Sequence, residues 1–467
     1  MQSSATPRRV LCHMIACAVL MLMANLGDVA HSRVSADDAP LISEGVHLIG
    51  ADQWHAAGFT GKGVKIGVID FELPDAEKYL PNVKLTTKSF KSSPNDPFSA
   101  SYDFHYVTAF VEIIHEVAPD AEIYFAESDD GTSYPKALGW LIDEENITIL
   151  ADNNFWPSGV LDGSNIFDQY LHIVKQAGVF TSVSSLPEGS GLIGSTTARG
   201  HYGATFTDAD GDGYHDFSAV SGVPGMNSLP VRVVDQEVIY RNAPPSMKPQ
   251  AVFMNLFWNG DENSKMLYTL TIVDAQGKEV ARAQPFGSRV QYLQSLSATL
   301  PTGDYTMRIK KTQPDEPDVP FDVFFSGMQA TQVVPAGAFH VPQDSNDAVT
   351  VGPVNWQDDT IPPYVAHGPT QDGRTKPDLV APDCVSTPVQ ADSTKASLYL
   401  PNDSLTCGIA ASAHFAGAAA LYKQAYPDAT PDDILVYFQQ HAKKLTGADG
   451  DPNTSGAGRL QLGPPPA

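Results

Sequence analysis

Short apolar runs alternate with helical patterns along this chain, and this alternation restricts the fold more than any other feature of the sequence. Runs typical of strands buried on both faces lie at 64–70, 121–126 and 179–184. Apolar residues at helical spacing lie between them, at 111–117, 134–143 and 166–176. Strands connected in this way by helices form a parallel sheet with right-handed crossovers. We therefore expect an α/β fold with a doubly wound, mostly parallel sheet.

Two further helices are expected near the C-terminal end. A largely apolar helical pattern runs from His414 to Tyr426 and breaks at Pro427. Thr430 is then followed by a proline and by the carboxylates Asp432 and Asp433. A hydroxyl at the N-cap, proline at the first helical position and early acidic residues are typical of a helix N-terminus, so a new helix should begin there.

The pattern changes between residues 219 and 336. Short strand-like runs separated by turn residues lie at 252–258, 266–274, 278–283, 303–310 and 321–326. Such a series indicates an antiparallel β-sandwich, and its length is ordinary for that architecture. We therefore expect a β-sandwich at 219–336, inserted into a discontinuous α/β domain made of residues 45–218 and 337–467.

Charge and the N-terminal segment restrict the location and partners of the protein. The 467 residues include 29 basic and 54 acidic side chains, a formal net charge of −25, which argues against nucleic acid as a partner. Arg8 and Arg9 precede the apolar run 10–26, and small residues follow at 34–36. Residues 1–36 therefore resemble a secretory signal peptide, with a lipid anchor at Cys17 as a weaker alternative. We expect a secreted or periplasmic protein without a membrane span.

Two cysteines remain after the predicted signal peptide. Cys12 and Cys17 lie within that segment, which leaves Cys384 and Cys407 in an oxidising compartment. An even pair with no third cysteine is most simply read as one disulfide. A bonded Cys407 could not act as a nucleophile.

An acidic loop has the spacing of calcium ligands. The loop offers side-chain oxygens at positions one, three, five and nine of an EF-hand-like loop, from Asp208, Asp210, Asp212 and Asp216. Position seven is Tyr214, which offers its backbone carbonyl. The twelfth position is Ala219, so the usual bidentate glutamate is missing. We expect weak Ca²⁺ binding, and the alternative is an acidic turn held by side-chain to backbone bonds without an ion.

One segment resembles the nucleophile region of the subtilisin-like serine peptidases, whose pattern is Gly-Thr-Ser-x-Ala-x-Pro-His-Val-Ala-Gly. Residues 406–421 read Thr-Cys-Gly-Ile-Ala-Ala-Ser-Ala-His-Phe-Ala-Gly-Ala-Ala-Ala-Leu, and their His-Phe-Ala-Gly sets the register. Further segments similar to landmarks of that family follow in the same order, at 66–70, 115–126, 368–383 and 456–460. The resemblance implies a subtilisin-like doubly wound domain around the inserted sandwich.

The resemblance also implies where catalytic residues should stand, and three of these positions are changed. Asp70 is retained at the end of the first strand, but the histidine position falls on Tyr106. A phenol, with an ordinary pKa of about 10, is a poor general base. The oxyanion asparagine position falls on Pro187, which has no side-chain donor, and the nucleophile position falls on Ile409. An alkyl group has no lone pair with which to attack a carbonyl.

The predicted edge of the substrate cleft is altered as well. Asn154, Phe155 and Trp156 cover the segment that is Asn-Ser-Trp in the family pattern, and Pro157 follows in place of glycine. Proline removes a backbone donor from an edge against which an extended substrate would pair.

These substitutions favour a pseudopeptidase, a peptidase homologue that binds a peptide, protein or glycan without cleaving it. The alternative is an active enzyme, either a serine endopeptidase that uses His105, Ser404 or Ser412, or a hydrolase of another class. Ser412 lies close to one helical turn from Ile409, which makes a geometric replacement of the nucleophile unfavourable.

Overall fold

The computed structural model of the protein describes residues 42–92, 105–156, 161–185, 198–217, 226–234, 251–258, 267–285, 293–391 and 406–466. Several sequence predictions lie outside the described residues, namely the signal peptide at 1–36 and the roles of Pro157, Pro187 and Ser404. Residues 41–467 group into one compact unit. In the part of the chain that the structure describes, no helix is both long enough and apolar enough to cross a membrane.

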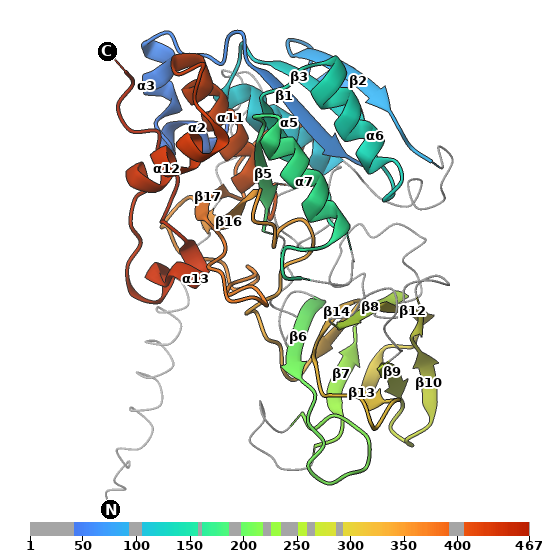
Figure 1. Cartoon of the computed structure of the whole chain (residues 1–467). Helices are drawn as coiled ribbons and strands as arrows, with labels where there is room; N and C mark the ends of the chain where they lie inside the picture. The colour runs from blue at the N-terminus through green and yellow to red at the C-terminus, as the bar shows by residue number, and fades with distance from the viewer. Residues whose placement is uncertain are drawn as a thin grey trace, which may run out of the picture. The chain divides into compact units, whose positions relative to one another are not determined.

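A parallel sheet of seven strands forms the α/β part of the molecule (Figure 1), in the order β17-β16-β5-β4-β1-β3-β2. All of its neighbouring strands run parallel. The strands are β1 (Lys65–Asp70), β2 (Lys84–Ser89), β3 (Glu122–Glu127), β4 (Ile149–Asp152), β5 (Phe180–Ser184), β16 (Val349–Asn355) and β17 (Leu379–Asp383). The expected α/β class with a doubly wound parallel sheet is confirmed.

Helices cover both faces of this sheet, and the side chains of β1 show why. Ile66 and Val68 point into the hydrophobic core that contains α5 and α11, whereas Ile69 points into the core that contains α6 and α7. Burying each such side chain stabilises the fold by about 1.5–3 kcal/mol. The helical segments are α2 (Glu44–Leu48), α3 (Ala51–Ala56), α4 (Ala76–Tyr79), α5 (His105–Val117), α6 (Tyr134–Gly139), η2 (Trp140–Glu144), α7 (Ile166–Gln176), α10 (Pro388–Ala391), α11 (Ala410–Ala425), α12 (Pro431–His441), η4 (Gly447–Gly450) and α13 (Pro452–Ser455).

The expected start of the last long helix is confirmed. Thr430 is the N-cap of α12, and its hydroxyl accepts a hydrogen bond from the Asp433 N–H at 3.2 Å. The Asp433 carboxylate in turn accepts the Thr430 N–H at 2.9 Å, which completes a capping box. The pattern at 134–143 was read as one helix, but α6 ends at Gly139 and the chain continues as the π-helical segment η2.

Two antiparallel sheets of five strands each form the sandwich, in the orders β10-β9-β13-β7-β15 and β11-β12-β8-β14-β6. Their strands are β6 (Arg199–Thr205), β7 (Leu229–Val233), β8 (Ala251–Trp258), β9 (Tyr268–Val273), β10 (Glu279–Arg282), β11 (Gln284–Pro285), β12 (Leu293–Thr299), β13 (Gly303–Lys311), β14 (Pro320–Ser326) and β15 (Met328–Ala330). The strands thus begin at Arg199 rather than after residue 219. Strand β6 contains two glycines and few β-branched residues, so only its pairing with β14 reveals it.

The expected disulfide is present. Cys384 directly follows β17, and it is bonded to Cys407, which lies just before α11. The bond therefore holds the N-terminal end of α11 next to the carboxyl end of β17, an edge strand of the parallel sheet.

Candidate functional site

The candidate site lies at the carboxyl ends of β1 and β4. The chain continues from β1 to β2 and β3 on one side of the sheet and to β4 on the other, so the strand order reverses at β1. In open α/β sheets, ligands bind outside the carboxyl ends of the strands at such a reversal. Because Ile69 pairs with Asp152 across the two strands, Asp70 and Asn153 are brought side by side.

Asp70 is fully buried and is held by three donors. Its Oδ2 accepts a hydrogen bond from Asn153 Nδ2 at 2.8 Å, and its Oδ1 accepts from the Phe71 N–H at 2.6 Å and from the Tyr106 hydroxyl at 3.2 Å. Burial raises the pKa of this carboxyl to about 7, against the opposing effect of the hydrogen bonds. Tyr106, at the predicted histidine position, thus does contact Asp70, but its phenol hydroxyl donates a hydrogen bond to the carboxyl group.

Tyr106 and Ile409 belong to the same hydrophobic core. Tyr106 is 2% exposed and Ile409 is 0% exposed, so neither offers a surface to solvent. Ile409 is the N-cap residue of α11 and makes no side-chain hydrogen bond there. Where the resemblance implies an exposed nucleophile at the start of this helix, the structure has a buried hydrocarbon group.

The backbone N–H groups around Ile409 are all engaged. The Gly408 N–H donates to Asp383 Oδ2 at 2.7 Å, and the Ala410 N–H donates to Asp383 Oδ1 at 3.1 Å. The Ile409 N–H donates to the Thr406 carbonyl at 3.2 Å. An oxyanion hole needs N–H groups aimed at the position where negative charge develops. Here the carboxylate of Asp383 takes up two of these donors within the protein itself.

Asp383 is the main site residue that sequence reasoning did not single out. It ends β17, is fully buried, and also accepts a hydrogen bond from the Tyr364 hydroxyl at 3.3 Å. Burial raises the pKa of Asp383 to about 7, although four hydrogen bonds oppose the shift. An acidic residue bonded to N–H groups at the start of a helix is a favourable arrangement, and an aspartate at the end of an apolar strand was the available signal.

The alternative catalytic residues are bonded elsewhere. Ser412 is fully buried, with its hydroxyl 2.5 Å from the Ser184 hydroxyl and 3.3 Å from the Ile409 carbonyl. His105 lies at the start of α5, where its Nε2 is 3.0 Å from Asp75 Oδ2. The structure therefore does not bring these two residues together at Asp70.

One serine and one histidine are in contact in the core. The Oγ atom of Ser43 lies 2.8 Å from Nε2 of His414. The Ala410 carbonyl lies 2.7 Å from Nδ1 and can only accept, so Nδ1 carries the ring proton and Nε2 accepts from the Ser43 hydroxyl. Burial lowers the pKa of His414 to about 4. Ser43 is 2% exposed and His414 is 0% exposed, which keeps substrate away, so we assign this pair a structural role.

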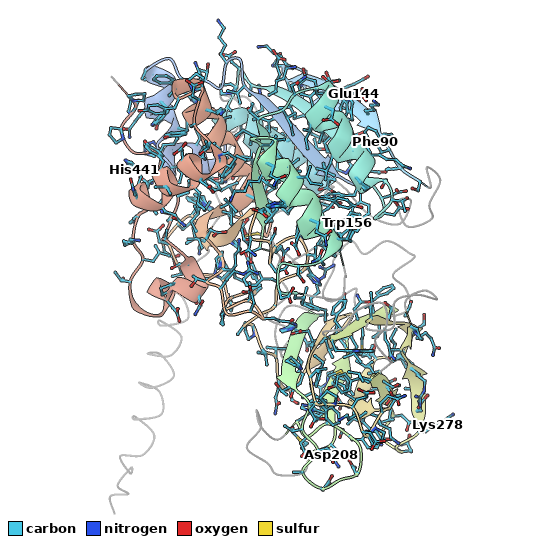
Figure 2. All side chains as sticks on the ribbon, in the orientation of Figure 1. Phe90, Glu144, Trp156, Asp208, Lys278 and His441 are labelled. Carbon is cyan, nitrogen blue, oxygen red and sulfur yellow. A yellow bond between two sulfur atoms is a disulfide. The ribbon has the colours of Figure 1, made fainter. Side chains whose placement is uncertain are left out.

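The predicted edge of the substrate cleft is largely buried. Asn154 is 3% exposed and Trp156 is 8% exposed, and Phe155 is half-buried. The N–H of Trp156, which Figure 2 labels, donates to the Val341 carbonyl at 2.7 Å, and the Trp156 ring stacks on Phe167 of α7 with centroids 5.2 Å apart. This N–H is therefore already used inside the protein and is not available to pair with an extended peptide.

The predicted calcium loop does bring its first acidic residues together. Carboxylate oxygens of Asp208, Asp210 and Asp212 lie within 4.8 Å of one another. These oxygens are hard donors of the kind that Ca²⁺ prefers. Tyr214 and Asp216 lie in the same loop.

The fold is of the subtilisin-like α/β class. The chain resembles the structure of the Clostridium perfringens CspB protease, with a TM-score of 0.60 and 16% sequence identity, over 88% of this chain and 95% of that one. This likeness, at such low identity, establishes the fold alone.

Sequence comparison relates the C-terminal part of the chain to a known family. Residues 328–458 match the model of the subtilase family. Serine protease AprX of Bacillus subtilis (strain 168) is 32% identical over 135 residues, which are 26% of this chain and 29% of that protein. The matched region thus spans less than a third of that relative. The expected resemblance to the subtilisin-like family is confirmed.

Proposed function

We propose that the protein is a secreted, catalytically inactive homologue of the subtilisin-like peptidases that binds a peptide, protein or glycan. The observation that carries this proposal is the start of α11, where Ile409 is buried and the adjacent N–H groups donate to Asp383. Acyl transfer needs a nucleophile with a lone pair and free donors for the oxyanion. The signal-like residues 1–36 and the disulfide support secretion.

Labelling with a fluorophosphonate tests the loss of catalysis. This reagent reacts with serines that a neighbouring base activates, and we expect no labelled serine in the native, full-length secreted protein. We also expect casein to remain intact on incubation with the purified protein. A labelled Ser404 or Ser412 would establish the alternative, a serine endopeptidase that uses non-standard residues.

A cavity on the sandwich supports the binding part of the proposal. It measures about 170 Å³ and is lined by Tyr214, Thr269, Thr271, Val273, Gly277, Glu279, Arg282, Arg308 and Lys310. Arg282 is paired with Glu279, whereas Arg308 and Lys310 form no ion pair among the described residues. On a chain of net charge −25, two such cations next to threonine hydroxyls favour a ligand with a carboxylate or sulfate group.

The strand register places these groups in rows across the sheet. Thr271 of β9 lies opposite Arg308 of β13 on one side and opposite Arg282 of β10 on the other. Residues directly opposite one another share a face of the sheet. Arg308 and the Glu279-paired Arg282 therefore flank the Thr271 hydroxyl on one face of the sheet.

Binding of model polyanions tests this cavity. We expect the protein to bind immobilised heparin or polyglutamate, and the variant Arg308→Ala with Lys310→Ala to lose at least tenfold in affinity. Lys278→Ala, which removes one positive charge on the nearby turn outside the cavity, should bind as the unchanged protein does. Equal binding by all three proteins would remove the cavity from the proposal.

A further inference from the structure

We propose that the loop 208–216, together with Asn227, forms a Ca²⁺ site on the sandwich. Figure 2 labels Asp208 on this loop, which connects β6 to β7. The site would hold one ion by oxygen atoms only, directly from the carboxylates of Asp208, Asp210 and Asp212, the side-chain amide of Asn227 and the carbonyl of Tyr214, and through a water from Asp216 at position nine. Such an all-oxygen donor set suits Ca²⁺ rather than Zn²⁺.

The loop backbone already has the conformation that such a site needs. Asp208 accepts hydrogen bonds from the N–H groups of Gly211 at 2.8 Å, Asp212 at 3.1 Å and Gly213 at 2.9 Å. Gly213 has a φ of 84°, which a residue with a side chain rarely adopts. The chain therefore turns sharply around Asp208, and the carboxylates of Asp210 and Asp212 converge on it.

Asp216 provides independent support for a bound cation. It is 3% exposed, and its Oδ2 accepts a hydrogen bond from the Ala209 N–H at 2.7 Å, which turns the carboxylate toward the loop. Its Oδ1 is buried and has no hydrogen-bond partner in the described part of the chain. A buried carboxylate oxygen without a donor is costly, and a water bound to a metal ion in the loop would satisfy it.

Asn227 provides an oxygen that the loop sequence itself lacks. Its Nδ2 lies 3.1 Å from Asp210 Oδ2 and 2.7 Å from Asp212 Oδ2, so its amide contacts two of the convergent carboxylates. Its Oδ1 is buried and has no partner among the described residues. The two ends of an amide are nearly equivalent in shape, and a half-turn of the group directs the oxygen to the same place. Asn227 would thus replace the missing glutamate of position twelve.

An ion in the loop would also stabilise a wall of the cationic cavity. Tyr214 pairs with Lys310 across an isolated bridge, and the Lys310 ammonium lies 5.1 Å from the centre of the Tyr214 ring. Tyr214 itself lines the cavity. Since its carbonyl is the expected ligand at position seven, bound Ca²⁺ would fix the backbone from which this ring projects. This consequence rests on the proposed binding function, whereas the ion site does not.

Calorimetric titration and thermal melting of the full-length secreted protein with CaCl₂ test the site. We expect saturable heat with a Kd on the order of 10⁻⁴–10⁻³ M, the range of extracellular modules, and a higher melting temperature in Ca²⁺. The same concentration of MgCl₂ should raise the melting temperature less, because Mg²⁺ demands stricter geometry. Terbium luminescence offers a second readout, with Tyr214 as the sensitising ring.

Three variants separate an ion site from a generic acidic surface. Asp212→Asn and Asn227→Ala should each weaken Ca²⁺ binding at least tenfold, and Asn227→Ala does so without any change of charge. Asp274→Asn removes an acidic group from a turn of the same sandwich, where its Oδ1 accepts from Gln276 and Lys278 N–H groups, and should leave binding unchanged. Absence of heat and of a melting shift at about 10 mM Ca²⁺, tenfold above the expected range, would overturn the proposal. So would wild-type affinity in the Asn227→Ala variant.

Discussion

Single residues at the candidate site form a buried polar network around a hydrocarbon. Asp70 is held by Asn153 and Tyr106, and Asp383 is held by Tyr364 and by the N–H groups that flank Ile409. Buried polar groups stabilise a fold when each has its partner, and they become costly when one partner is lost. The site therefore has the properties of a packed interior, with Tyr106 and Ile409 both buried in it.

A serine at position 409 should destabilise the protein without giving it peptidase activity. Ile409→Ser removes a fully buried alkyl group, and we expect it to lower the free energy of unfolding by about 2–5 kcal/mol, as large-to-small core changes do. Hydrolysis of casein should stay at the buffer rate, also with Tyr106→His added, because Asp383 still occupies the flanking N–H groups.

Urea denaturation and a casein assay measure the two parts of this prediction. Ile409→Val is the matched control, since it keeps the site apolar and should cost only about 0.5–1.5 kcal/mol. Proteolysis above the buffer rate in Ile409→Ser would show that the donors around α11 can be freed by a substrate.

At the scale of elements, the short helix α2 packs closely against α11 at one glycine, Gly45. A Cβ on Gly45 would lie 1.9 Å from Nε2 of His414, the atom that accepts from Ser43. Alanine usually favours a helix over glycine, but here it would displace the imidazole and break its hydrogen bond. The close approach of the two helices therefore requires glycine at this position.

Gly45→Ala should consequently lower the free energy of unfolding by about 1–3 kcal/mol, the usual cost of overpacking. Gly139→Ala is the matched control, because it lies at the end of α6 with no atom within 4 Å of a new Cβ, and it should raise stability by up to about 1 kcal/mol. Thermal and urea denaturation of both variants measure the difference. A Gly45→Ala protein as stable as Gly139→Ala would mean that α2 does not pack against His414.

Elements with strong local signals were predictable from the sequence, and elements held by distant partners were not. Helix α7 covers the expected 166–176, because Asn165 and Asp168 form a capping box at its start. Strand β4 has only four residues, and β6 contains two glycines, so neither has a pattern of its own. Both are formed by pairing with strands that are far away in the sequence.

The same distinction holds for the candidate site. The positions of Asp70, Tyr106 and Ile409 follow from register within segments that resemble a known family. The contacts of Asp383 with the start of α11 join residues 25 and 27 positions apart, and the Ser43–His414 pair joins residues 371 positions apart. A single sequence contains no periodic signal for such pairs. Asn227 was missed for the same reason, because it lies beyond the loop whose spacing suggested an ion.

At the scale of the whole molecule, several carboxyl groups are buried together although the chain is strongly acidic. Burial raises the pKa of Glu112 to about 7 and that of Glu116 to about 8, in addition to the shifts of Asp70 and Asp383 to about 7. Glu116 is also raised by the neighbouring charges of Glu112 and Glu44. Each of these groups binds its proton more tightly in the folded state than in the unfolded chain, so folding and proton binding are linked.

The free energy of unfolding should therefore fall as the pH rises from about 5 to about 8. Unfolded carboxyl groups have pKa values of about 4, so between pH 4 and 8 these carboxyl groups bind more protons in the folded protein than in the unfolded chain. The stability that these groups contribute is fully present below their unfolded pKa and is lost as the pH rises through the folded values near 7 and 8.

Urea denaturation at a series of pH values measures this slope. Glu116→Gln should make it shallower, because the amide keeps the buried side chain without titrating, whereas Glu144→Gln, at a side chain that is 65% exposed, should leave it unchanged. A free energy of unfolding that is constant or increases over this range would show that the buried carboxyl groups stay ionised in the folded protein.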